Sequence, residues 1–280
     1  MITVRPSLPE DVPAQRELWK LAFGDSDAYI DNFYENYYRP ERVVVLEEEG
    51  AVRSMTAWFD TTFVVPGRGE YRAAYLYAVA THPDCRGRGL AGELLAGADG
   101  YLRSLGIPAV TTVPAEPSLH DFFGANGFRE CFTYSQAAPA VNQRPVRSFD
   151  LEPVSVKRYA QLREGFLSGI PHIAYPPDAL EYQLGCCRLS GGGLYLAETG
   201  RGTALLCAEG TEGGALIIKE LLAPPEAQAQ ILVCLDDLHC SGAVRTPGDD
   251  VKFGMLKWLD PVLEKSWDWD TAGYLGLAFD

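Results

Sequence analysis

The sequence predicts an α/β (α+β) fold in which mixed sheets are flanked by helices. Apolar stretches typical of strands alternate along the chain with helical periodicities, and three consecutive strand-like segments are joined by tight turns. A buried strand, a glycine-containing loop and an amphipathic helix follow one another over residues 73–106. Hairpin-joined strands combined with a strand–helix–strand crossover predict a mixed sheet rather than an all-parallel one.

Length and composition restrict the class of protein. The 280 residues are enough for two domains, and 47% hydrophobic with 22% charged residues is typical of a globular protein. A formal net charge of −14 disfavours nucleic acid or an anionic membrane as a partner and favours a cationic substrate such as an amine. The sequence has neither an apolar run of membrane-spanning length nor a signal-peptide pattern, so we expect a cytoplasmic protein. Seven cysteines without a Cys-x-x-Cys pair indicate neither a disulfide framework nor a metal site.

The first half of the chain predicts one continuous series of elements. Its order is strand, two helices, three strands, helix, strand, helix and strand, at residues 2–5, 7–24, 26–38, 42–46, 51–65, 71–80, 90–105, 107–113, 116–127 and 128–136. Ser7, with Glu10 three residues later, predicts a capping box for the first helix, and Ser26 or Asp27 caps the second. The strand at 107–113 must run parallel to the central strand, because a helix connects the two.

The loop after the central strand has the features of a phosphate-binding site. Gly87 and Gly89 allow close approach of the backbone, and the helix that follows offers unpaired N–H groups and a partial positive charge. Arg86 and Arg88 add charged donors. The stretch is neither a Walker loop nor the dinucleotide-binding Gly-x-Gly-x-x-Gly pattern. The alternative is an ordinary turn before an amphipathic helix, which leaves both arginines unexplained.

This loop resembles motif A of the GNAT acyltransferases, whose pattern is Arg/Gln-x-x-Gly-x-Gly/Ala. The matching residues are Arg86, Gly89 and Ala91, and the order of elements over residues 1 to about 138 is also similar to the GNAT core. The resemblance implies that the central strand and the next strand splay apart, that the thioester of acetyl-CoA lies in the gap, and that the loop binds its pyrophosphate. It assigns cosubstrate contacts to Val79, Ala80, Thr81, Arg86, Gly87, Arg88, Gly89, Leu90, Ala91 and Gly92.

The same resemblance implies an N-acetyltransferase. It would transfer the acetyl group of acetyl-CoA to a primary amine of a small molecule or peptide, by direct attack in a ternary complex and without a metal. The tyrosine that commonly protonates the departing thiolate is replaced by Phe123. Tyr75 and Tyr77 share one strand face and are the candidate catalytic proton carriers, with aromatic core packing as the alternative for both. The nearby carboxylates Asp60 and Glu116 are more typical of a solvated surface.

The absence of the usual tyrosine leaves a second function open, a non-catalytic acyl-CoA-binding sensor or interaction module. The acceptor amine is not identified by the sequence, and neither is the oligomeric state, for which a homodimer is one option. Binding without turnover on a broad panel of amines would favour the sensor.

The second half repeats the order of elements without the loop. A proline-containing linker at 139–153 separates a domain at 1–138 from one at 154–280, where we expect helices at 155–167 and 178–189, strands at 193–198, 203–209 and 215–222, and a helix at 226–239. Pro224, Pro225 and Glu226 stand where the phosphate loop would be. The half therefore resembles a degenerate GNAT-like domain. Two such cores in tandem are loosely similar to the enhanced-intracellular-survival class, which carries a further sterol-carrier-like domain.

Overall fold

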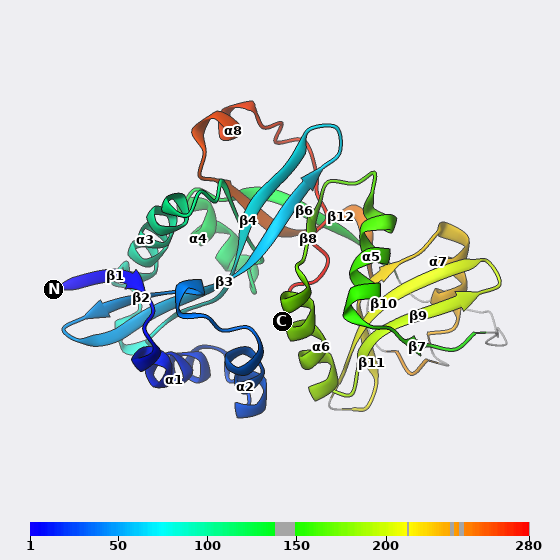
Figure 1. Cartoon of the computed structure of the whole chain (residues 1–280), viewed down its shortest axis with the longest axis horizontal. Coiled ribbons are helices and arrows are strands. Elements are labelled where there is room, and N and C mark those ends of the chain that lie inside the picture. Colours follow the sequence, from blue (N-terminus) through cyan, green and yellow to red (C-terminus); the bar gives the residue numbers. More distant parts are fainter. Residues whose placement is uncertain (138–148, 212, 236–237, 241–243, 280) are drawn as a thin grey trace. The chain divides into compact units, whose positions relative to one another are not determined.

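The computed structural model describes residues 1–137, 149–211, 213–235, 238–240 and 244–279 (Figure 1). The chain forms two compact units. Unit 1 contains Met1–Phe63, Glu70–Cys131 and Gly254–Thr271, and unit 2 contains Val64–Gly69, Phe132–Phe253 and Ala272–Asp280. Residue 138 and residues 139–148 of the predicted linker lie outside the described residues, while Glu152–Pro153 at the end of that linker form strand β7.

Unit 1 has the predicted order of elements, with one addition from the far end of the chain. Its elements are β1 (Ile2–Pro6), α1 (Val12–Phe23), α2 (Asp27–Asn36), β2 (Val43–Glu48), β3 (Ala51–Val65), β4 (Gly69–Thr81), α3 (Leu90–Ser104), β5 (Ala109–Thr112), α4 (Pro117–Ala125), the first residues of β6 (Arg129–Ala137), the last residues of β12 (Val244–Trp258) and α8 (Pro261–Ser266). Short 3-10 turns lie at Pro9–Asp11, Pro40–Arg42 and Pro83–Cys85.

The first helix begins later than the sequence predicts. Asp11, rather than Ser7, makes the local side-chain contact, because its carboxylate accepts a hydrogen bond from the Leu8 N–H at 2.7 Å. The same carboxylate pairs with the Arg5 guanidinium at 2.7 Å, which lowers the pKa of Asp11. The second helix follows the prediction, since the Ser26 side chain accepts the Tyr29 N–H.

The sheet of unit 1 has helices on both faces (Figure 1). Its strands run in the order β1-β2-β3-β4-β5-β12, and β5 is parallel to β4 as predicted. Alternate residues of β2 divide between the two sides: Val44 and Leu46 pack with Leu94 of α3 in one apolar cluster. On the other side, Phe59 of β3 packs on Phe33 of α2, with ring centroids 6.3 Å apart.

The last residues of β12 belong to unit 1, which the sequence does not predict. Residues 255–258 pair antiparallel with β5, from Met255 opposite Thr112 to Trp258 opposite Ala109. Lys257 fixes this strand to the helices: its ammonium group donates to the Asn126 carbonyl at 2.7 Å and to the Asp99 carboxylate. The compact units therefore differ from a single cut near residue 138.

Unit 2 contains a second, smaller sheet. Its described elements are the rest of β6 and of β12, β7 (Glu152–Pro153), α5 (Val156–Leu167), β8 (His172–Ala174), α6 (Pro177–Leu189), β9 (Gly193–Thr199), β10 (Gly202–Gly210), β11 (Leu216–Leu222) and α7 (Pro225–Val233). The helix predicted at 226–239 is shorter in the structure, where α7 ends at Val233. The helices predicted at 155–167 and 178–189 are present almost to the residue.

The layers of unit 2 follow the same order as those of unit 1. The sheet order is β11-β10-β9-β7, with each neighbouring pair antiparallel. On one face, Leu206 packs with Ile231 of α7 in an apolar cluster. The next residue, Cys207, points to the other face, where its sulfur lies 3.6 Å from that of Cys187 on α6. Two helices before the strands and one after them therefore cover opposite faces, as in unit 1.

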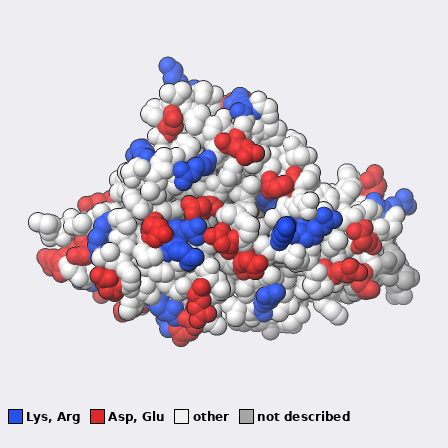
Figure 2. All heavy atoms as spheres, in the orientation of Figure 1, with Lys and Arg blue, Asp and Glu red and all other residues white. Residues whose placement is uncertain are grey.

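Charged side chains of both signs are interspersed on the surface drawn in Figure 2, without a large basic area. No helix within the described residues is long and apolar enough to cross a membrane.

Candidate active site

The central strand β4 extends beyond its neighbour β5. The two strands pair from Ala73 opposite Ala109 to Leu76 opposite Thr112, where β5 ends, while β4 continues to Thr81. Parallel strands that separate in this way expose main-chain N–H and C=O groups on one edge. We call the unpaired edge of β4 beyond Leu76 the gap; that the thioester of acetyl-CoA lies there stays a prediction.

A local distortion sets the direction of these main-chain groups. Ala78 has φ of 51°, an unusual value for a residue with a Cβ. Hydrogen bonds from Thr56 Oγ1 to the Tyr77 carbonyl, at 3.3 Å, and from Ser54 Oγ to the Ala80 carbonyl, at 2.7 Å, show that both carbonyls face β3. In a regular strand, residues three apart face opposite edges, so Ala78 inserts one extra residue. The main-chain groups of Val79 consequently face the gap.

The loop that follows ends at an uncapped helix N-terminus. Gly87 and Gly89 adopt φ of 75° and 82°, and Gly89 is the N-cap of α3 without a side chain to cap it. The first intrahelical bond runs from Glu93 N–H to the Gly89 carbonyl, at 3.1 Å. The amides of Leu90, Ala91 and Gly92 precede that bond, so they point along the helix axis and have no acceptor within the helix.

The loop has open space next to two of its glycines. A Cβ added at Gly87 or Gly89 would have no heavy atom within 4 Å. At Gly92 the added Cβ would lie 3.3 Å from Asn126 Oδ1, so the first turn of α3 also passes close to the end of α4. The glycines thus serve different needs: Gly87 and Gly89 provide a backbone conformation, and Gly92 provides room.

The two loop arginines have different surroundings. Arg86 Nε donates to the Thr81 carbonyl at 3.3 Å, which holds the guanidinium beside the end of β4. Arg88 forms a two-point contact with Glu48, at 3.0 and 2.5 Å, and this contact lowers the pKa of Glu48. The structure places Arg88 in an exposed ion pair. That both arginines are phosphate donors stays a prediction.

The sequence of this region matches a family model. Residues 3–128, a little less than half of the chain, match the GNAT acetyltransferase domain and are called the GNAT domain below. The predicted resemblance is confirmed for the part of the chain that contains the β4–loop–α3 segment.

Solved structures extend the likeness to both units. A GCN5-related N-acetyltransferase from Anabaena variabilis ATCC 29413 has 17% identity and a TM-score of 0.70, over 93% of this chain and 73% of that one. Another from Kribbella flavida has 16% identity and a TM-score of 0.64, over 91% and 70%. Eis1 from Mycobacterium abscessus has 12% identity and a TM-score of 0.62, over 93% and 74%. At these identities the likeness shows the fold alone. No curated protein matches the sequence.

The structure separates the two candidate tyrosines of the GNAT domain. Both rings contact Phe59 and therefore lie on the same side of β4. The centroid of the Phe59 ring is 6.2 Å from that of Tyr75 and 5.3 Å from that of Tyr77. Tyr75 is 2% exposed and lies within the aromatic core. Tyr77 is partly exposed and stands immediately after Leu76, the last residue of β4 that pairs with β5.

The other candidates are engaged elsewhere or buried. The Asp60 carboxylate pairs with Arg42 at 2.9 Å, and Glu116 accepts from Ser118 Oγ at 3.3 Å. At the loop entry, His82 Nδ1 accepts the Asp84 N–H at 3.3 Å. Phe123 is 4% exposed inside an apolar cluster, so it contributes packing rather than a proton.

Two features of the GNAT domain are not predicted by the sequence. Ala78 carries no mark of its unusual backbone, since a glycine would be the expected residue there. The second feature is the contact of Tyr29, whose hydroxyl oxygen lies 3.0 Å from that of Tyr77. The aromatic density of residues 29–38 is the only sequence signal that could have drawn attention to it.

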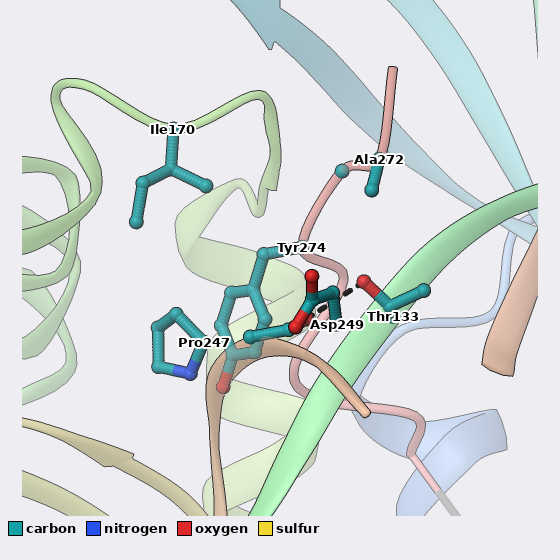
Figure 3. Close-up of a pocket in the computed structure, with 8 residues that line it drawn as sticks. Thr133, Ile170, Pro247, Asp249, Ala272 and Tyr274 are labelled. Atoms are coloured by element: carbon teal, nitrogen blue, oxygen red, sulfur yellow. Dashed lines mark hydrogen bonds between the residues drawn. The ribbon is translucent and has the colours of Figure 1, made fainter. Parts of the chain in front are cut away.

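Unit 2 contains a pocket of its own, with a volume of about 290 Å³ (Figure 3). Asp249 is its charged side chain, and the Thr133 hydroxyl beside it donates to the Gly248 carbonyl at 2.7 Å. None of the residues predicted to bind acetyl-CoA is among those described as lining it. Within the described residues, no group of three or more His, Cys, Asp or Glu side chains is arranged to hold a metal ion.

Proposed function

We propose that the GNAT domain transfers the acetyl group of acetyl-CoA to a primary amine of a small molecule or peptide, by direct attack in a ternary complex. One observation carries the proposal: β4 runs past β5 and leads, through a loop with two left-handed glycines, into an uncapped helix N-terminus. This segment offers amides for an anion and an exposed strand edge within the same few residues.

The cosubstrate is assigned to these groups by their chemistry. Its pyrophosphate suits the amides between Gly87 and Gly92 and the guanidinium of Arg86, because all are donors at the positive end of a helix. The cosubstrate also has an arm that contains amides. This arm suits the N–H and C=O groups of Val79, because it can pair with them as a neighbouring strand would. The exposed side of Gly87 and Gly89 provides the space.

Acetyl transfer to an amine has three requirements. The amine must be neutral, the tetrahedral oxyanion needs a donor, and the departing sulfur needs a proton. We assign the oxyanion donor to the Val79 N–H, because this group faces the gap. Tyr77 is the group that supplies the proton, because it is partly exposed at the point where the strands separate, whereas Tyr75 is in the core.

Two measurements test the proposal. Calorimetric titration of the full chain with acetyl-CoA should give one site per chain. Release of free thiol should then be followed with arylalkylamines, polyamines, aminoglycosides and peptides with free N-termini. Turnover with any of these amines supports the transferase. Binding without turnover on the whole panel would favour the acyl-CoA sensor, and absence of binding would remove both functions.

A further inference from the structure

The hydroxyl groups of Tyr29 and Tyr77 form a pair in unit 1. Their oxygens lie 3.0 Å apart, which is hydrogen-bond distance, although the residues come from α2 and β4. Tyr29 is held by the first turn of α2, where its N–H donates to Ser26 Oγ at 3.3 Å. The Tyr77 ring meets the edge of Trp19, with centroids 5.5 Å apart. Both phenols are thus fixed by their own elements.

Packing alone does not require these hydroxyls. The neighbouring aromatic side chains Trp19, Phe33 and Phe59 are at most 1% exposed and fill the interior. Tyr29 and Tyr77 are both partly exposed, so the pair lies at the border between this aromatic core and solvent. Each phenol has one O–H hydrogen. A hydrogen bond between the two phenols uses one of these hydrogens, and the other points to a different acceptor.

Four aspartates on or beside the surrounding elements have partners of their own. Asp25 accepts from Trp19 Nε1 at 2.7 Å, and Asp60 of β3 pairs with Arg42 at 2.9 Å. On α2, Asp27 pairs with Lys20 and Asp31 pairs with Arg16. The Tyr77 hydroxyl oxygen lies 3.0 Å from that of Tyr29.

We propose that Tyr29 is a positioning residue for Tyr77 and connects its hydroxyl to solvent during acetyl transfer. The proposal rests on the function proposed above. When the amine attacks, the C–N bond forms and the C–S bond breaks. The leaving thiolate takes the Tyr77 proton, and the Tyr29 proton moves to the Tyr77 oxygen. Solvent restores the proton to Tyr29, which balances the proton that the amine nitrogen releases to solvent.

The test compares single and double variants of the full chain. Tyr77→Phe should lower kcat by about 10²–10⁴-fold, the usual contribution of general acid–base catalysis. Tyr29→Phe should lower kcat by roughly tenfold or more, with unchanged KM for both substrates and unchanged Tm, since only a proton path is interrupted. The double variant should be no slower than Tyr77→Phe, because Tyr29 acts only through Tyr77.

Tyr34→Phe is the matched control. Tyr34 also packs against Trp19 and Phe33, but its hydroxyl donates to Gln15 Oε1 at 3.1 Å instead of to Tyr77. Its kcat should equal that of the wild type.

Each other result is informative. Equal losses in Tyr29→Phe and Tyr34→Phe would make the effect one of packing. A wild-type rate in Tyr29→Phe, with a slow Tyr77→Phe, would overturn the role of Tyr29 and leave the proposed function standing. A wild-type rate in Tyr77→Phe would remove both tyrosines. No turnover by the wild type would overturn the transferase itself together with this inference.

Discussion

The two units differ most at the point where a buried strand leads into a helix. In unit 1, residues 82–89 separate β4 from α3, whereas in unit 2 only Ala223 and Pro224 separate β11 from α7. The longer connection gives room for the turn at Gly87 and for the left-handed N-cap Gly89. The shorter one leads directly into the helix.

The chemical groups at the N-termini of α3 and α7 also differ, and those of α3 suit an anion better. The first turn of α3 presents amides, while α7 begins with Pro224 as N-cap and Pro225 as its first residue, followed by Glu226. Proline has no N–H, and a carboxylate repels phosphate. The comparison teaches that a shared order of elements does not create an anion site. We infer that the connection after the central strand does so, and that only unit 1 binds the cosubstrate.

The sharpest test of this difference is a charge placed at each helix start. Gly89→Glu should abolish acetyl-CoA binding, with a loss of at least about 100-fold in Kd, because it adds both a negative charge and a strained left-handed residue. Pro224→Glu puts the same charge at the exposed N-cap of α7. This variant should bind acetyl-CoA with the affinity of the wild type. Calorimetry on both folded variants measures this. Normal binding by folded Gly89→Glu would make the loop assignment wrong.

The central strands offer a second contrast. Where β4 carries the partly exposed Tyr77, β11 carries Glu220, which is 0% exposed and pairs with Arg163 at 3.0 Å. Glu220→Gln should destabilise unit 2 by about 3 kcal/mol, because it leaves the buried Arg163 charge with only the half-exposed Glu164 carboxylate, 3.7 Å away, as a described ionic partner. Hydrogen exchange of β11 peptides in increasing urea would measure the change.

Glu198→Gln is the control for that substitution. Its carboxylate is exposed and accepts only from Thr203 Oγ1 among the described bonds, at 2.9 Å, so stability should change by less than about 0.5 kcal/mol. Equal protection of the β11 amides from hydrogen exchange in both variants would show that Glu220 is not needed to stabilise the buried charge of Arg163.

The smallest expected effect belongs to the paired arginine of the loop. Arg88→Ala should weaken acetyl-CoA binding by on the order of 1–3 kcal/mol, less at high salt, because the guanidinium is exposed and shared with Glu48. Arg158→Ala removes an equally exposed charge from the first turn of α5 in unit 2 and should have no effect. Equal losses in the two variants would indicate a long-range charge effect rather than a contact.

Local chemistry explains what the sequence predicts well. The glycine loop, the apolar spacing of α3 and the caps Ser26 and Ser155 all depend on residues a few positions apart, and the structure has them where expected. The Ser7 cap fails for an equally local reason: Asp11 makes the contact, assisted by Arg5.

Contacts between distant residues explain what the sequence does not predict. Strand β12 contains Pro247, Gly248 and two aspartates, a composition typical of a turn, and its partner β5 lies far away in the chain. The Tyr29–Tyr77 contact likewise depends on how α2 packs on the sheet. No local pattern distinguishes such a pair from ordinary aromatic packing.

The pairing of β12 with β5 also sets the order of events during synthesis. A ribosome making roughly 5–20 residues per second needs several seconds to tens of seconds between the emergence of Thr112 and that of Trp258. Throughout that interval the nascent GNAT domain has β5 as an unpaired edge, which is a site for association with other chains. β5 is short, from Ala109 to Thr112, which limits this exposure until the last strand arrives.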